Sequence, residues 1–95
     1  MVIVAYDVRT ADVAGQARLR KVADACSDYG RRVQSSVFEC LLYPEDYMEL
    51  KRRLERIIDP EKDSVKFYKL GAKWEERVEF IGIKRGVNRS EDIFI

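Results

Sequence analysis

The chain has 95 residues, of which 46% are hydrophobic and 37% are charged, a composition typical of one small globular domain. Its formal net charge is only +1, so a nucleic-acid partner is not indicated by total charge and must be argued from local clusters. No apolar run approaches the roughly 20 residues that cross a bilayer, and the N-terminus lacks the basic segment of a signal peptide. We therefore expect a cytoplasmic protein without membrane contact.

The first half of the chain is predicted to hold two strands and one helix. Residues 1–6 form an uninterrupted apolar run, as in a strand covered on both faces. Residues 8–16 carry turn and loop residue types, and apolar residues at helical spacing then predict a helix over 17–29. Gly30 is expected to close this helix as a left-handed cap. Residues 32–42, rich in Val, Ser, Phe and Leu, are predicted to form the second strand.

The second half is predicted to hold one helix and up to three strands. The helix starts at residues 43–46, where a proline precedes two acids, and ends before Pro60. Residues 64–70 alternate in polarity as a third strand, and residues 78–83 are predicted as a fourth. A short fifth strand is expected at residues 93–95.

We interpret residues 1–95 as a single α+β domain, a ferredoxin-like sandwich in β-α-β-β-α-β order with an antiparallel sheet. The tail, residues 85–95, carries the short C-terminal strand. Both helices of such a fold cover one sheet face, and the other face is usually polar. Here both faces carry large apolar groups, as Val37 and Phe38 illustrate. We therefore predict a symmetric homodimer that buries the second face, with the tail at the interface. The alternative is a lone domain with a mildly apolar open face.

The cysteines and the absence of histidine limit the available chemistry. Cys26 and Cys40 form no C-x-x-C motif, and we expect both to be buried free thiols. Histidine, the commonest general base and metal ligand, is missing from the sequence. Any hydrolysis must then rely on carboxylates, a metal ion or positioned arginines.

Asp7 is the first candidate for such chemistry. It follows a wholly apolar strand at the start of a loop, where an acid can face a shared cleft. An aspartate in this position more often accepts hydrogen bonds from the amides of its own loop. Both interpretations stay open at this point.

Basic residues form the second candidate. Segment 17–32 holds five basic and two acidic residues, a local net charge of +3. Arginines in such a patch suit phosphate oxygens, which they contact through two N–H groups at once. A solvated helix face explains the same charges equally well. A smaller basic cluster near the C-terminus comprises Lys84, Arg85 and Arg89, for which an exposed turn is the alternative.

Four segments share their order and spacing with the motifs of one family: V-A-Y-D-V at 4–8, G-Q-A-R-L-R-K-V at 15–22, Y-G-R-R-V-Q-S-S-V-F-E at 29–39 and I-I-D-P-E-K-D-S-V at 57–65. In these segments the chain resembles the second core CRISPR-associated (Cas) protein family. The third segment is the most specific of the four, and the resemblance covers about residues 1–70.

The resemblance implies a ferredoxin-like homodimer in which Asp7 is the catalytic, metal-binding residue. The two Asp7 side chains would face each other across the dimer axis and share a weakly held Mg²⁺. The implied nucleic-acid contacts are Arg18, Arg20, Arg31, Arg32, Ser36 and Phe38. The arginines would hold the phosphates, with no firm choice between Arg31 and Arg32, whereas Ser36 and Phe38 would line the cleft.

The implied activity is that of a metal-dependent endonuclease, which cleaves RNA or duplex DNA and takes part in CRISPR spacer acquisition with the integrase as its partner. Some family members instead serve as non-catalytic, DNA-binding scaffolds of the integration complex, and this alternative needs no chemistry at Asp7. A metabolite-binding regulatory domain also fits the fold, but it leaves segment 29–39 unexplained. A toxin-like ribonuclease of similar fold is a related possibility.

Overall fold

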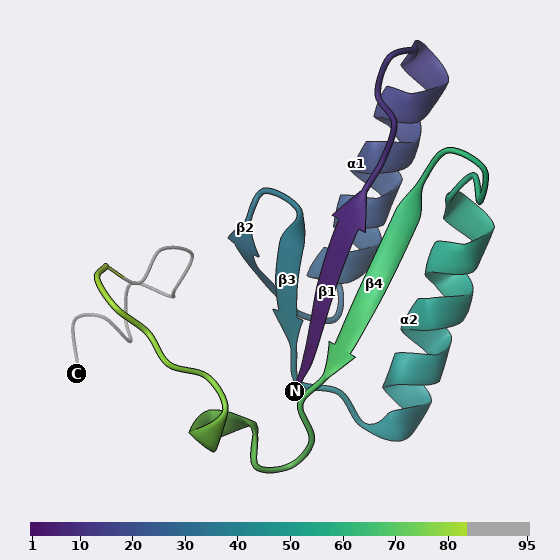
Figure 1. The fold of residues 1–95 in the computed structure, drawn as a ribbon. Helices are drawn as coiled ribbons and strands as arrows, with labels where there is room; N and C mark the ends of the chain where they lie inside the picture. The colour runs from purple at the N-terminus through teal and green to yellow at the C-terminus, as the bar shows by residue number, and fades with distance from the viewer. Residues whose placement is uncertain (84–95) are drawn as a thin grey trace.

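A computed structural model describes residues 1–83 of the chain. In chain order its elements are β1 (Val2–Asp7), α1 (Val13–Ser27), β2 (Arg31–Gln34), β3 (Val37–Cys40), α2 (Pro44–Ile57), β4 (Ser64–Lys69) and a 3₁₀ turn, η1 (Trp74–Glu76). The four strands form one antiparallel sheet in the order β2-β3-β1-β4, and both helices lie on the same face of it (Figure 1). The ferredoxin-like α+β fold with β-α-β-β-α-β order is confirmed.

The second predicted strand is a hairpin rather than one strand. Residues 31–34 and 37–40 pair as β2 and β3, and the turn between them is made by Ser35 and Ser36. The register shifts between Arg32 and Gln34, which marks a β-bulge at the end of β2. Serine favours turns because its hydroxyl competes for nearby backbone groups. The predicted single strand therefore supplies two of the four strands in the sheet.

The strand predicted at residues 78–83 is wrong. Gly71 has a φ of +80°, a left-handed conformation that glycine adopts without steric cost, and the chain leaves the sheet there. Residues 71–83 then run away from β4 (Figure 1). Ile81 is 97% exposed, and residues 78–83 pair with no strand within the described part of the chain. The strand predicted at 93–95 lies outside the described residues.

Helix α1 begins earlier than its apolar spacing indicates. Asp12 is the N-cap, and its side chain accepts a hydrogen bond of 2.7 Å from the backbone N–H of Gly15. Residues that suggested a loop therefore form the first turn of the helix. Of the helices in residues 1–83, none is long and apolar enough to cross a membrane.

Gly30 does not form the predicted left-handed cap. Among the described residues, a positive φ occurs only at Gly71 and Gly82. A Cβ on Gly30 would instead collide with the Glu39 carbonyl oxygen and with Cys40 Sγ. Glycine is needed here because β3 passes directly against the end of α1.

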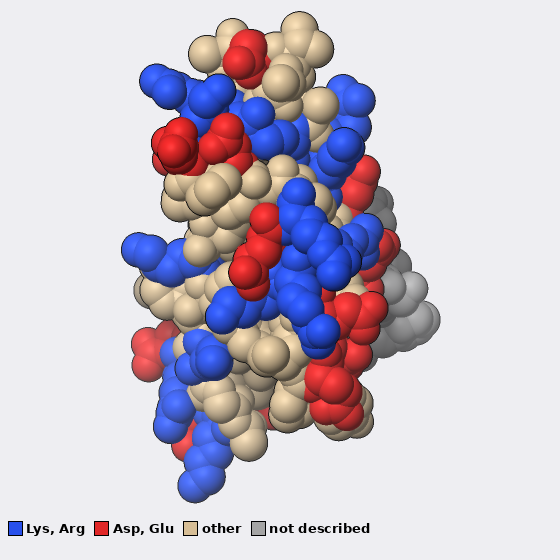
Figure 2. All heavy atoms as spheres, turned by 90° about the vertical axis from the view of Figure 1, so that its right-hand side faces the viewer, with Lys and Arg blue, Asp and Glu red and all other residues tan. Residues whose placement is uncertain are grey.

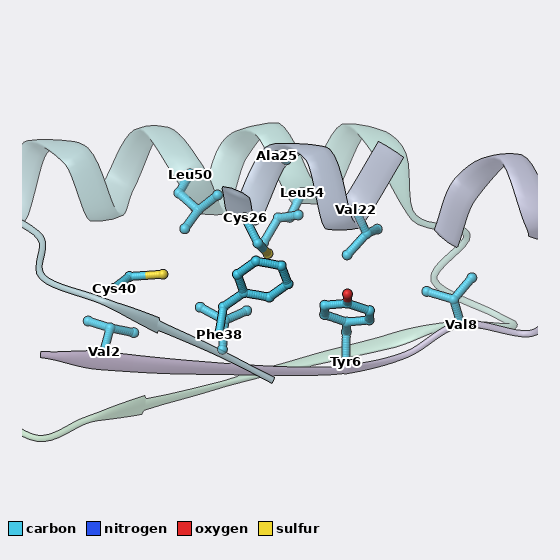
Figure 3. Close-up of a cluster of buried hydrophobic side chains, with 11 residues drawn as sticks. Val2, Tyr6, Val8, Val22, Ala25, Cys26, Phe38, Cys40, Leu50 and Leu54 are labelled. Carbon is cyan, nitrogen blue, oxygen red and sulfur yellow. The ribbon is translucent and has the colours of Figure 1, made fainter. Parts of the chain in front are cut away.

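The hydrophobic core fills the space between the sheet and the two helices (Figure 3). Its members are Val2, Val4, Tyr6, Val8, Phe38 and Cys40 from the sheet side, and Val22, Ala25, Cys26, Leu50 and Leu54 from the helices. Both cysteines are free and buried, which confirms the sequence prediction. Burial raises the pKa of the Cys26 thiol to about 12 and that of Cys40 to about 11, so both are unreactive packing groups near neutral pH.

The opposite sheet face is mixed in character. Ile3, Ala5 and Val37 are half-buried, whereas Tyr68 is 47% exposed and its ring lies 5.9 Å from Lys66 Nζ. This face thus carries a central apolar strip with charges beside it. The homodimer that would cover it stays a prediction.

Candidate active site and nucleic-acid interface

Asp7 is the last residue of β1 and lies on the open face of the sheet. Val4 and Tyr6 of the same strand are buried against the helices, whereas Asp7 is exposed. Its Cα partner across the β1–β4 ladder is Ser64, the first residue of β4. Within residues 1–83 its carboxylate forms no hydrogen bond or ion pair. The loop-amide role that sequence position favours is therefore absent from the described part of the chain.

The loop that follows Asp7 is held by a second aspartate, Asp63, whose side chain is completely buried. The Arg9 backbone N–H donates to Asp63 Oδ1 (3.0 Å), and the Asp59 backbone N–H donates to Oδ2 (2.9 Å). Arg18 donates from Nε to Oδ2 (2.7 Å) and from Nη2 to Oδ1 (3.3 Å). The Arg18 hydrogen bond, aided by the two backbone amides and opposed by desolvation, lowers the pKa of Asp63 to about 2.

Sequence reasoning did not identify Asp63 as important. It lies in segment 57–65, one of the four that carry the family resemblance, and no local pattern there marks it as a site residue. Arg18, predicted as a phosphate contact, has its guanidinium on this carboxylate, and its side chain is only 16% exposed.

Arg20 and Arg32 lie together on the helix side of the sheet edge. Arg20 comes from α1 and Arg32 from β2, and both line a hollow of about 590 Å³. A second hollow, of about 700 Å³, adjoins it because both are lined by Leu19 and Arg32. Ser36 lines this second hollow, so three of the predicted contacts border a groove made of two adjoining hollows between α1 and the β2–β3 hairpin.

The groove is anchored to the strand that ends in Asp7. The Tyr6 backbone N–H donates to the Ser36 carbonyl (3.0 Å), and the Tyr6 hydroxyl donates to the Ser35 carbonyl (3.3 Å). The hairpin turn is thus fixed beside the residue that precedes Asp7.

The remaining predicted contacts lie elsewhere. Phe38 is 1% exposed and packs in the core, so its side chain does not line a surface cleft. Its ring instead supports Arg32, whose guanidinium carbon is 5.2 Å from the ring centroid. Arg31 extends from the opposite face of β2, where it forms an ion pair of 3.9 Å with Glu39. It therefore shares the open face with Asp7. The basic cluster at Lys84, Arg85 and Arg89 lies outside the described residues.

The flank formed by α2 is charged but mixed (Figure 2). Lysines and arginines alternate there with acids, and Arg53 pairs with Asp28 of α1 at 2.7 Å. Because the charges of this flank largely cancel, it offers a weaker field to phosphates than a purely basic surface would.

A metal site is not complete within one described chain. Residues 1–83 contain no group of three or more His, Cys, Asp or Glu side chains placed to hold an ion. The free carboxylate of Asp7 is an oxygen ligand of the kind that Mg²⁺ prefers, but it supplies a single protein ligand. The residues therefore fit a magnesium ion only if a second copy, water or substrate provides the rest.

Comparison with known proteins shows the family to which the chain belongs. The sequence model of the family described as CRISPR associated protein Cas2 matches residues 1–78. The chain belongs to the Cas2 family. The resemblance found in the four sequence segments is thereby confirmed.

Close Cas2 relatives span nearly the whole chain. A protein of Rhodospirillum rubrum named CRISPR-associated endoribonuclease Cas2 3 is 52% identical over 88 residues, which cover 93% of each chain. The CRISPR-associated endonuclease Cas2 of Halalkalibacterium halodurans is 44% identical over 98% of this chain and 97% of its own. The crystal structure of Streptococcus pyogenes Cas2 at pH 6.5 superposes with a TM-score of 0.74 at 53% identity, covering 85% of this chain and 98% of that one.

Proposed function

We propose that this Cas2-family protein is a metal-dependent endonuclease that hydrolyses phosphodiester bonds of RNA or duplex DNA during CRISPR spacer acquisition, together with the integrase. Asp7 is its catalytic residue. The observation that carries the proposal is the exposed carboxylate at the end of β1, which has no partner within residues 1–83. The relatives named endoribonuclease and endonuclease support the same activity.

The metal requires two copies of the chain in this proposal. The open sheet faces of two protomers pair, and the two Asp7 carboxylates share one weakly held Mg²⁺, with waters and phosphate oxygens as the other ligands. When bound, the ion lowers the pKa of a water molecule and neutralises charge on the phosphodiester. Asp7 holds the ion, and the arginines hold the phosphates on either side. Arg31 does so from the open face, whereas Arg20 and Arg32 do so from the groove, with Ser36 beside them.

A non-catalytic scaffold that binds DNA for the integrase is the second candidate. It is favoured by the incomplete metal site of a single described chain. It is also favoured by the arginines that border the groove between α1 and the hairpin, since backbone contacts of this kind fix position without chemistry. This role needs Arg20 and Arg32 but not Asp7.

The two candidates separate when purified protein is incubated with labelled RNA and labelled duplex DNA, in Mg²⁺ or in EDTA. We expect cleavage in Mg²⁺ only, and a decrease of about 100-fold or more in Asp7→Asn because the ion loses its only charged protein ligand in each copy. Asp28→Asn, which alters an exposed carboxylate at the far end of α1, is the matched control and should cleave like the wild type.

Cleavage that persists in Asp7→Asn would contradict the enzyme proposal. Absence of cleavage, combined with DNA binding that survives Asp7→Asn but weakens in Arg20→Ala and Arg32→Ala, would establish the scaffold role instead. Light scattering tests the dimer, and a stable species of 11.1 kDa at micromolar concentration would exclude the shared metal site.

A further inference from the structure

Asp63 is the only charged residue among residues 1–83 that is buried, and all of its acceptor capacity is used. An ionised carboxylate has about four lone-pair sites on its two oxygens. Here Oδ1 accepts from Arg9 N and Arg18 Nη2, and Oδ2 accepts from Arg18 Nε and Asp59 N, at 2.7–3.3 Å. A carboxylate bonded in this way has one orientation, and it has no lone pair left for a metal ion or a reacting water.

These bonds join the two backbone segments that flank Asp7. Arg9 lies two residues after Asp7, on the loop by which the chain leaves β1. Asp63 directly precedes Ser64, which is the Cα partner of Asp7 in the β1–β4 ladder. The Asp63 carboxylate therefore joins the loop that follows Asp7 to the start of β4, which pairs with Asp7.

Arg18 completes this tie from α1. Besides its two bonds to Asp63, its Nη2 lies 3.5 Å from the Arg9 carbonyl oxygen and donates to it. An arginine can bind a phosphate through two edges of its guanidinium, and the edge formed by Nε and Nη2 is already occupied here. The positive charge of Arg18 is also balanced by the Asp63 carboxylate, so the pair adds little to the basic surface around Arg20.

We infer that Arg18 and Asp63 are positioning residues for Asp7, and that Arg18 acts through Asp63 on the loop after β1 rather than by contacting a nucleic-acid phosphate. This inference rests on the proposed function, because it takes Asp7 as the catalytic carboxylate. It also reassigns Arg18, for which the family resemblance implies a nucleic-acid contact.

The test compares Arg18→Ala, Asp63→Asn and the double variant with Arg20→Ala, which removes a proposed phosphate contact. Arg53→Ala is the matched control, because it breaks an Arg–Asp pair of the same 2.7 Å length far from Asp7. Single-turnover cleavage rate constants are measured with saturating RNA or duplex DNA. The Kd for the same nucleic acid is measured in Ca²⁺ at salt concentrations from about 50 to 200 mM. Each variant is assayed at a temperature where its circular dichroism matches the wild type.

We expect Arg18→Ala and Asp63→Asn each to lower the cleavage rate constant by about 10- to 100-fold, because a misplaced reacting group loses rate without losing binding. Kd and its salt dependence should stay within about twofold of the wild type. The double variant should be no slower than the slower single variant, since both changes break one unit. Arg20→Ala should instead weaken binding and reduce the slope of log Kd against log salt by about 0.7–0.9.

The inference is overturned if Arg18→Ala loses affinity and salt slope as Arg20→Ala does while Asp63→Asn does not, or if the two rate losses multiply. If Arg18→Ala does not fold, Arg18→Lys replaces it. Lysine keeps the charge but not the two-point contact, so positioning predicts a slower rate and a simple phosphate contact predicts a normal one.

Asp7→Asn, measured in the same series, separates a failure of the proposed function from a failure of the positioning role. If Asp7→Asn cleaves at the same rate as the wild type, the proposed function is refuted. An inactive Asp7→Asn together with an Arg18→Ala variant that behaves like Arg20→Ala refutes only the positioning role. If the wild type binds but does not cleave, the catalytic positioning role fails with the enzyme, and the Kd data still decide whether Arg18 contacts phosphate.

Discussion

Two Arg–Asp pairs in this protein have the same length and different surroundings. Arg18–Asp63 and Arg53–Asp28 both have an N–O distance of 2.7 Å. The side chains of the first pair are 16% and 0% exposed, whereas those of the second are 42% and 60% exposed. Asp63 also accepts two backbone amides, which join distant segments of the chain. Because water reaches mainly the second pair and the first has additional hydrogen bonds, we expect the two pairs to contribute differently to stability despite their equal length.

The largest difference between the pairs is expected when the aspartates are removed. Asp63→Ala leaves Arg18 and two backbone N–H groups without their acceptor, and we expect the free energy of unfolding to fall by about 2–3 kcal/mol. Urea denaturation of the purified variants measures this change. Asp28→Ala serves as the control, and an equal loss of stability in the two variants would show that burial does not distinguish the pairs.

Acid should weaken the buried pair within a defined pH window. The native pKa of Asp63 is about 2, below its ordinary value of 3.8, so the unfolded state takes up the proton first as pH falls. The resulting stabilisation is fully present above about pH 4 and is lost as pH falls through about 2. Relative to Asp63→Asn, we expect the wild type to lose on the order of 2 kcal/mol over this window, measured by urea denaturation at several pH values. A stability difference that does not change with pH would contradict this assignment.

The smallest expected difference between the two pairs is in how salt changes their coupling free energies. We expect a double-mutant cycle on Arg53 and Asp28 to give a coupling free energy of about 0.5 kcal/mol or less in dilute buffer. This coupling should vanish near 1 M salt, where the Debye length is about 3 Å. The coupling between Arg18 and Asp63 should persist in the same salt because water and ions reach it poorly. Loss of both couplings together would mean that the buried pair is as screened as the exposed one.

Local patterns were sufficient for most elements of the fold. The proline and the acids at the start of α2, and the apolar run of β1, indicated those elements correctly. The prediction failed at residues 78–83, which are apolar enough for a strand. Whether such a segment joins a sheet depends on where the preceding chain leads, and here Gly71 directs it away from β4.

Sequence alone determined the family, the position of Asp7 at the end of an apolar strand and the local excess of arginine, because each depends on residues close together in the chain. The tertiary structure decided how those arginines are used. Arg31 and Arg32 are neighbours in the sequence, yet the strand places them on opposite faces of the sheet. Arg18 meets Asp63 across 45 residues of sequence, a contact that no local pattern encodes because it forms only when α1 and the start of β4 pack together.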